Sequence, residues 1–242
     1  QQLALDHLLS HDQAALFMGC GLGKTGVVLH AQVELMLRGL SKGALIVAPL
    51  RVCNLTWPAE EDKWDVSRGF GIRSLRSKQG LAAFDRNEEG LYVVNYDMLK
   101  SLSDRWEGRR TFPFDTVVFD ELTRAKNPRS ANINALRPIL SRACKRRWGL
   151  TGTPAPNGLL DLFAQIRLLD EGLRLGRSYT EFRRTWFAPT DYMEYNWEPK
   201  PMARASIYQR ISGMALTLKS SDWLDIPDTI QEDVFAPLPK GE

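Results

Sequence analysis

The chain has 242 residues, of which 43% are hydrophobic and 25% are charged, a composition typical of folded globular proteins rather than disordered chains. Lysine and arginine number 32 against 29 for aspartate and glutamate, so the net charge alone does not indicate a nucleic-acid-binding protein.

The cysteines and the lengths of the apolar runs indicate the cellular compartment in which the protein is expected. Cys20, Cys53 and Cys144 are too far apart for a metal-binding pattern and indicate free thiols of a reducing compartment. The sequence has no apolar run of membrane-spanning length and no signal peptide, so we expect an intracellular, cytoplasmic protein with no membrane partner. Because the chain opens at Gln1 rather than at Met, we expect a fragment.

A glycine-rich loop lies near the start of the chain. Leucines within residues 3–9 predict a first helix, and residues 14–18 form an apolar run that predicts a buried strand. Gly19, Gly21 and Gly23 follow, and they let the backbone turn tightly and approach a ligand. Lys24 and Thr25 then open an apolar segment that predicts a buried helix up to about residue 38. This order of elements indicates a phosphate-binding loop, or P-loop.

In such a loop the backbone N–H groups and the helix N-terminus hold phosphates, Lys24 reaches the β- and γ-phosphates, and the Thr25 hydroxyl ligates Mg²⁺. Met18 stands where the usual pattern begins with glycine, so only Gly21-x-Gly23-Lys24-Thr25 matches. This shorter form is typical of helicase-type ATPases. The competing interpretation is a glycine-rich turn with an incidental lysine.

Further apolar runs predict an α/β fold. Strands are predicted at residues 43–48, 71–75, 91–96, 114–119 and 148–151. Helices are predicted to begin at Trp57 and to span residues 80–86, 131–146 and 159–169, with Pro138 as a kink. Buried strands that alternate with helices predict a parallel sheet.

Asp120 and Glu121 follow the strand predicted at residues 114–119. Two carboxylates at the carboxyl end of a buried strand are costly unless they meet a cation, and ligands of parallel sheets bind at this edge. Asp120 therefore suits Mg²⁺, usually through water, and Glu121 suits the polarisation of an attacking water. The alternative is a pair of solvated acids at a helix start.

The last third of the chain differs in composition, because it is rich in aromatic residues. Seven aromatic residues between 179 and 197 predict an irregular or helical insertion that packs on the main body, although aromatics interleaved with arginine can also stack on bases. Residues 207–218 predict a helix, and residues 234–239 a last short strand. Two basic clusters either bind phosphate backbones or form solvated helix faces. Their members are Arg137, Arg142, Lys145, Arg146 and Arg147, and Arg124, Lys126 and Arg129.

The ordered set of motifs resembles the first RecA-like lobe of a superfamily-two helicase-like ATPase, most closely the Swi/Snf-type DNA translocases. The stretches that carry the resemblance are Gln1, residues 18–25 (motif I), residues 45–50 with Asn54 and 57–60 (motif Ia), residues 93–96, residues 120–123 with 126–130 (motif II), residues 150–154 with Asn157 (motif III), and residues 218–227. The resemblance implies a three-layer RecA-like parallel sheet with a P-loop and a small helical, aromatic insertion near the C-terminus. It places the ATP-binding lobe at residues 1–170, the insertion at 171–233, and a last strand with the start of an interlobe linker at 234–242.

The resemblance also implies a function, namely hydrolysis of Mg-ATP that drives movement on double-stranded DNA, with RNA open as the polymer. The implied ATP-binding residues are Gln1, which reads adenine, and Gly19, Gly21, Leu22, Gly23, Lys24 and Thr25. Catalysis would rest on Lys24, Asp120 and Glu121, and Mg²⁺ would bind Thr25 and Asp120. The implied coupling residues are Thr151, Gly152 and Thr153, and the implied nucleic-acid contacts are Arg51, Asn54, Asn95 and Tyr96.

Two features depart from the family's pattern. Leu122 and Thr123 stand where the family has Ala or Gly and then His or Asp, so motif II lacks the usual residue for its polar link to motif III. The second RecA-like lobe, which carries arginine fingers, is expected to be missing from this chain, so the isolated lobe is expected to be nearly inactive.

Other interpretations stay open. One is a degenerate, non-catalytic lobe that binds nucleic acid or a partner. Another is a P-loop kinase or other NTPase, against which the ordered motifs II and III argue. The compact lobe indicates a bacterial or phage origin.

Overall fold

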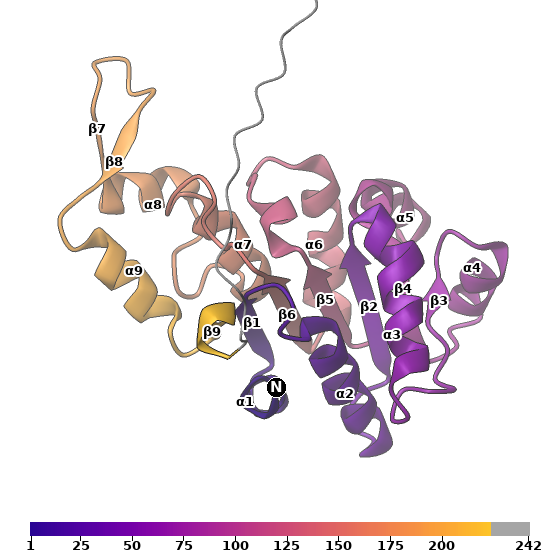
Figure 1. Cartoon of the computed structure of the whole chain (residues 1–242). Coiled ribbons are helices and arrows are strands. Elements are labelled where there is room, and N and C mark those ends of the chain that lie inside the picture. Colours follow the sequence, from indigo (N-terminus) through magenta and orange to yellow (C-terminus); the bar gives the residue numbers. More distant parts are fainter. Residues whose placement is uncertain (224–242) are drawn as a thin grey trace, which may run out of the picture.

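The computed structural model describes residues 1–223 and shows one parallel sheet with helices on both faces (Figure 1). The sheet has the strand order β3-β4-β2-β5-β6-β1-β9, and every neighbouring pair is parallel. The strands are β1 (Gln13–Met18), β2 (Gly43–Ala48), β3 (Arg73–Ser74), β4 (Gly90–Asn95), β5 (Thr116–Asp120), β6 (Arg146–Thr151) and β9 (Ala215–Leu218). This is the three-layer α/β arrangement that the sequence predicts. The strand predicted at residues 234–239 lies outside the described residues.

Alternating side chains give the sheet two buried faces. In β1, Leu16 and Met18 belong to the core on one face, whereas Ala15 and Phe17 belong to the core on the other. The first face is covered by α1 (Gln2–Ser10), α2 (Lys24–Leu37), a π-helical turn (Val52–Thr56) and α3 (Trp57–Lys63). The second is covered by α4 (Lys78–Asp85), α5 (Leu99–Arg105), α6 (Ala131–Ala143) and α7 (Asp161–Asp170). Burial on both faces explains why the central strands read as apolar runs.

The parallel strands direct their carboxyl ends to one edge of the sheet. Because β1 pairs with β6 and β6 pairs with β5, the loops that follow these three strands are neighbours. The P-loop, Thr151 and the pair Asp120–Glu121 therefore meet at this edge, where ligands of parallel sheets bind. In the described part of the chain, no helix is long and apolar enough to cross a membrane.

Between α7 and β9 the chain forms an outlying unit (Figure 1). It comprises α8 (Tyr179–Trp186), the antiparallel pair β7 (Phe187–Pro189) and β8 (Trp197–Pro199), and α9 (Ala203–Ile211). Phe182 is buried and packs against Phe163 of α7, with ring centroids 5.1 Å apart. Tyr192, between the hairpin strands, is 99% exposed. The aromatic residues therefore divide into a set that attaches this unit to the body and a set at the tip of its hairpin.

Two predicted helices end earlier than the sequence indicates. The prediction of a helix over residues 207–218 is wrong, because α9 ends at Ile211 and Ala215–Leu218 form β9. This strand pairs with β1, so the chain returns to the main sheet inside the range 171–233 that the sequence assigns to the insertion. The helix predicted at residues 131–146 ends at Ala143, and Arg146 begins β6. In both cases pairing with a distant strand overrides the local pattern.

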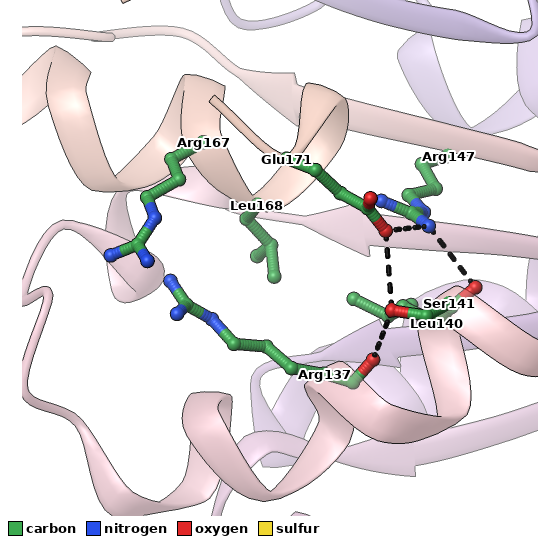
Figure 2. A pocket seen from close by; sticks show the side chains of 7 residues that line it. All are labelled: Arg137, Leu140, Ser141, Arg147, Arg167, Leu168 and Glu171. Atoms are coloured by element: carbon green, nitrogen blue, oxygen red, sulfur yellow. Dashed lines mark hydrogen bonds and ion pairs between the residues drawn. The ribbon is translucent and has the colours of Figure 1, made fainter. Parts of the chain in front are cut away.

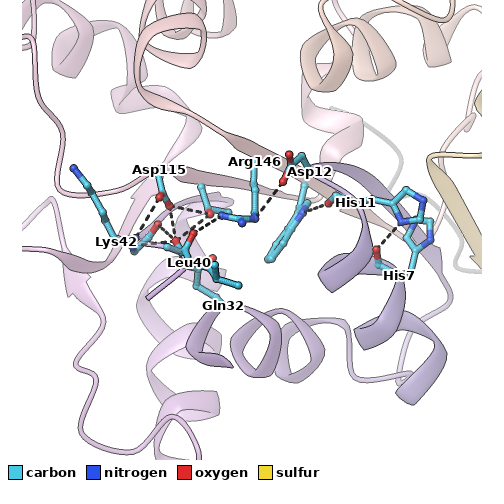
Figure 3. Close-up of polar contacts among 12 residues, drawn as sticks. His7, His11, Asp12, Gln32, Leu40, Lys42, Asp115 and Arg146 are labelled. Atoms are coloured by element: carbon cyan, nitrogen blue, oxygen red, sulfur yellow. Dashed lines mark hydrogen bonds and ion pairs between the residues drawn. The ribbon is translucent and has the colours of Figure 1, made fainter. Parts of the chain in front are cut away.

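Arg146 and Arg147 are buried, at 6% and 7% exposed. Arg146 donates to the Leu40 carbonyl at 3.0 Å and pairs with Asp12 at 3.4 Å (Figure 3). Arg147 donates to the Leu140 carbonyl and to Glu171, at 3.1 and 2.7 Å. The interpretation of these two arginines as part of a phosphate-backbone surface or solvated helix face is therefore wrong, because they are paired at the amino edge of the sheet.

Candidate active site

The P-loop turns sharply between β1 and α2. Gly21 and Gly23 have φ values of 81° and 77°, in the left-handed region that glycine occupies without strain. The Lys24 ammonium group donates to the carbonyl oxygens of Met18 at 2.9 Å and Gly19 at 3.1 Å. Met18 thus contributes to the loop through its carbonyl group, which any residue supplies. Its side chain is buried in the core, so the missing first glycine leaves the loop intact.

A pocket of about 400 Å³ opens beside the P-loop. It is lined by Gln1, Gln2, Leu3, Met18, Gly21, Leu22, Leu218 and Trp223. The amide of Gln1 lies so close to the loop that a Cβ atom on Gly23 would come within 2.3 Å of Gln1 Nε2. An amide that can bond a base edge therefore stands among apolar side chains, a lining that suits a planar heterocycle.

Asp120 ends β5 and is held by neutral donors. Its Oδ2 accepts a hydrogen bond from the Trp57 indole N–H at 3.0 Å, and its Oδ1 accepts one from the Glu121 backbone N–H at 3.0 Å. Burial nevertheless raises the pKa of this carboxyl group above its ordinary value. A desolvated carboxylate with no cationic side chain within salt-bridge distance in residues 1–223 is suited to a metal ion or a metal-bound water.

Glu121 links motif II to motif III. Its Oε1 accepts hydrogen bonds from the hydroxyl groups of Thr123 and Thr151, the latter at 2.9 Å. The Thr151 hydroxyl in turn accepts from the Thr153 backbone N–H at 3.2 Å. The polar link between motifs II and III is therefore the bond from Thr151 to Glu121, and Thr123 holds the same Glu121 oxygen from within motif II. Glu121 also has φ of 55°, a left-handed backbone that costs a residue with a side chain about 1–2 kcal/mol.

Asn95 and Tyr96, at the end of β4, are both buried. Tyr96 is 6% exposed, and its hydroxyl donates to the Asp120 carbonyl at 3.0 Å. Burial raises the pKa of this phenol well above its ordinary value, so it stays a donor. Asn95 is 4% exposed, and its amide donates to Asp97 at 3.3 Å. Both side chains are buried, and Tyr96 positions motif II, while their role as contacts to a nucleic-acid backbone stays a prediction.

The other predicted residues lie near the same edge. Arg51 and Asn54 are exposed in the turns that follow β2. Gly152 and Thr153 follow β6, with the Thr153 side chain exposed. Thr25 lies in the first turn of α2. The contribution that sequence reasoning missed is that of Trp57, whose indole holds Asp120 across 63 positions of the chain.

The oxygen atoms at this edge of the sheet suit a metal ion with few protein ligands. No group of three or more His, Cys, Asp or Glu side chains able to hold a metal ion occurs within residues 1–223. A metal at this edge would therefore take one or two protein oxygens and complete its shell with water and phosphate. Mg²⁺ binds in this way at phosphate sites, so Asp120 and Thr25 fit it.

A P-loop after β1, an acidic pair after β5 and a threonine pair after β6 define the first RecA-like lobe of a helicase-like ATPase. Comparison with known families specifies the class further. The family model of the SNF2-related domain matches residues 4–216, and the chain belongs to this family.

Two curated relatives show how much of a longer protein the chain represents. It is 36% identical to protein p41 of Acyrthosiphon pisum secondary endosymbiont phage 1, over 99% of this chain and 54% of p41. It is 30% identical to the human DNA repair and recombination protein RAD54B, over 70% of this chain and 18% of RAD54B. The chain therefore spans about half of p41 and less than a fifth of RAD54B.

Solved structures agree on the fold. The Sulfolobus solfataricus SWI2/SNF2 ATPase core, solved in complex with dsDNA, aligns with a TM-score of 0.72 and 21% identity over 90% of this chain and 43% of that chain. The UvsW helicase of bacteriophage T4 aligns with a TM-score of 0.55 and 14% identity, over 68% of this chain and 56% of that one. At these sequence identities, the structural similarity shows a shared fold alone.

Proposed function

We propose that this chain is the nucleotide-binding lobe of a DNA translocase that hydrolyses Mg-ATP. The observation that carries the proposal is the set of contacts around Glu121, which joins the end of β5 to Thr151 at the end of β6, beside the P-loop. A carboxylate held by two hydroxyl donors keeps a defined position. A defined position is required of a group that orients an attacking water.

Each residue of the site has a role in this proposal. The N–H groups of the P-loop and the first turn of α2 bind the phosphates, and Lys24 exchanges its carbonyl partners for phosphate oxygens. Gln1 bonds the adenine edge. Thr25 and Asp120 would hold Mg²⁺, which would neutralise charge on the phosphates. Glu121 orients the water that attacks the terminal phosphate.

The coupling residues connect nucleotide state to the rest of the lobe. Thr151 bonds Glu121 and also receives the Thr153 N–H, so a shift of Glu121 is transmitted to the loop after β6. The exposed residues Arg51 and Asn54, after β2 on the same sheet edge, would contact the phosphate backbone of duplex DNA without reading its sequence. RNA stays open as the polymer.

The proposal includes a second RecA-like lobe in the natural protein. An arginine finger from such a lobe accelerates phosphoryl transfer roughly 10³- to 10⁵-fold, so this chain alone would bind nucleotide but turn it over very slowly. The relatives' greater length supports this view. The similarity to a phage protein supports a bacterial or phage origin, and we propose a cytoplasmic location.

The test is DNA-stimulated ATPase activity of the natural protein with Glu121→Gln. We expect the rate to fall at least about 100-fold, because the amide cannot polarise water, while nucleotide binding persists. Glu107→Gln, at an exposed position on the body of the lobe, is the matched control and keeps the parental rate. An unchanged rate in Glu121→Gln would support the alternative of a non-catalytic lobe that binds nucleic acid or a partner.

A further inference from the structure

A second pocket lies at the opposite edge of the sheet from the nucleotide site. It has a volume of about 180 Å³ and is formed between α6 and α7 (Figure 2). Its lining comprises Arg137, Leu140, Ser141, Arg147, Arg167, Leu168 and Glu171. Arg147 stands near the start of β6, whereas Thr151 of the nucleotide site ends the same strand. The two sites are therefore separated by the length of β6.

One side of this pocket is a closed polar network. Arg147 donates to Glu171 at 2.7 Å and to the Leu140 carbonyl at 3.1 Å. The Ser141 hydroxyl lies within hydrogen-bond distance of both Glu171 and the Arg137 backbone carbonyl, at 3.2 and 3.1 Å. The negative charge of Glu171 is thus already engaged by Arg147, and this network fixes the wall between the two helices.

The other side holds two arginines that point toward each other. Figure 2 shows the guanidinium groups of Arg137, from α6, and Arg167, from α7, converging across the pocket. Within residues 1–223, neither forms an ion pair with an acidic side chain or a side-chain hydrogen bond. Burial and the charge of Arg167 lower the pKa of Arg137, which agrees with two like charges facing each other in a half-buried space.

Helix propensity alone does not explain this arrangement. Arg167 lies in the last turn of α7, where the helix dipole favours a cation. That preference is satisfied equally well by a side chain that extends into solvent. Convergence on Arg137 instead adds repulsion, and a long flexible side chain could relieve it by rotating away.

We propose that the pocket between α6 and α7 binds a phosphate group, held by the guanidinium groups of Arg137 and Arg167. Three arginines and one glutamate give the lining a net charge of +2, which matches a phosphate dianion better than a single carboxylate. Guanidinium groups bind such oxyanions through paired, charge-assisted hydrogen bonds. The phosphate belongs either to a small phosphate compound or to a nucleic-acid backbone. The site is independent of the proposed ATPase activity.

The test uses the full chain with Lys24→Ala, which weakens phosphate binding at the P-loop. Melting temperature and calorimetric titration are measured with inorganic phosphate and, at equal ionic strength, with chloride. We expect phosphate to stabilise this parent. Arg137→Gln and Arg167→Gln should each weaken phosphate binding about tenfold or more. Because Arg137→Gln removes a repulsion and no side-chain hydrogen bond formed within residues 1–223, it should not lower the melting temperature in chloride.

Arg142→Gln is the matched control, since Arg142 is exposed on the same helix and, among residues 1–223, its side chain bonds only the Pro138 carbonyl of that helix. It should respond to phosphate as the parent does. The proposal is overturned if Arg137→Gln and Arg167→Gln keep the parental response, or if Arg142→Gln loses as much. A salt slope of duplex-DNA binding that falls by about one in Arg137→Gln identifies a backbone phosphate, and an unchanged slope identifies a small phosphate compound.

Discussion

The two edges of the parallel sheet treat buried charge in opposite ways. At the carboxyl edge, Asp120 and Glu121 accept hydrogen bonds from neutral groups, namely an indole, a backbone amide and two hydroxyls. At the amino edge, Arg146 and Arg147 are neutralised by Asp12 and Glu171. Neutral donors hold a charged group in position but leave its net charge uncompensated. An ion pair compensates that charge, so little net charge is left to attract a ligand.

Charged groups that act on ligands are thus held by neutral partners, whereas charged groups that stabilise the fold are paired with opposite charges. Lys24 follows the first pattern, because its partners are the carbonyl groups of Met18 and Gly19. Among the described residues, no salt bridge involves Lys24, Asp120 or Glu121. Arg137 and Arg167 lie at the amino edge but lack acidic partners there, which is why their pocket stands out from its surroundings.

The largest effect should come from disturbing the neutral donors. Thr151→Val keeps the volume of a fully buried side chain but removes the hydroxyl that bonds Glu121. Loss of a hydrogen bond to a charged group costs about 1.5–3 kcal/mol, so DNA-stimulated ATPase activity of the natural protein should fall roughly 10- to 100-fold. Thr217→Val, on the edge strand β9, is the control. Equal rates in Thr151→Val and the parent would show that the link between motifs II and III is dispensable.

A smaller effect, on stability rather than rate, should follow at the amino edge. Arg147→Met keeps much of the aliphatic stem but removes the donors to Leu140 and Glu171. We expect the free energy of unfolding in urea to fall by about 1–2 kcal/mol. Arg142→Met, at an exposed position, should change it by less than about 0.5 kcal/mol. The ATPase rate per folded molecule should stay at the parental level in both, and a reduced rate in Arg147→Met would contradict the division between the edges.

The sequence predicts the apolar strands and the P-loop because both depend on local pattern. Residues 14–18 and 43–48 are continuous apolar runs, and the glycines with Lys24 and Thr25 are adjacent in the chain. The family resemblance adds motif order, and through it Asp120, Glu121 and Thr151 as parts of one site. The matched SNF2-related family confirms that resemblance.

What the sequence does not predict depends on contacts between distant segments. Ala215–Leu218 form a strand only because β1 offers an open edge to them. The roles of Trp57 and Tyr96 depend on hydrogen bonds to Asp120 that span 63 and 24 positions. Arg146 and Arg147 look like surface charges in a basic cluster until strand pairing buries them.

The smallest expected effects are changes in melting temperature with pH, which should have opposite signs at the two edges of the sheet. The hydrogen bond from Arg147 holds the pKa of Glu171 below its ordinary value of 4.5, whereas burial raises the pKa of Asp120 above 3.8. Ionised Glu171 therefore stabilises the fold at neutral pH, and ionised Asp120 destabilises it. The melting temperature at pH 7 should be lower than the parent's in Glu171→Gln. In Asp120→Asn the side-chain amide nitrogen faces an N–H donor, so this variant is compared with the parent across the pH range rather than at pH 7 alone. Since Glu171 is 56% exposed, its effect should stay below about 1 kcal/mol.

The two differences should change in opposite directions as pH falls. The deficit of Glu171→Gln should fade only as pH falls below 4.5, through the lowered pKa of the folded state. The difference between Asp120→Asn and the parent should move in the parent's favour as pH falls through the raised pKa toward 3.8, because the parent loses a destabilising charge that the variant lacks. Melting curves between pH 7 and pH 3.5 measure both. If the difference between Asp120→Asn and the parent moves in the variant's favour on acidification, the Asp120 carboxylate is a stabilising charge, and the two edges do not differ in the way their hydrogen bonds indicate.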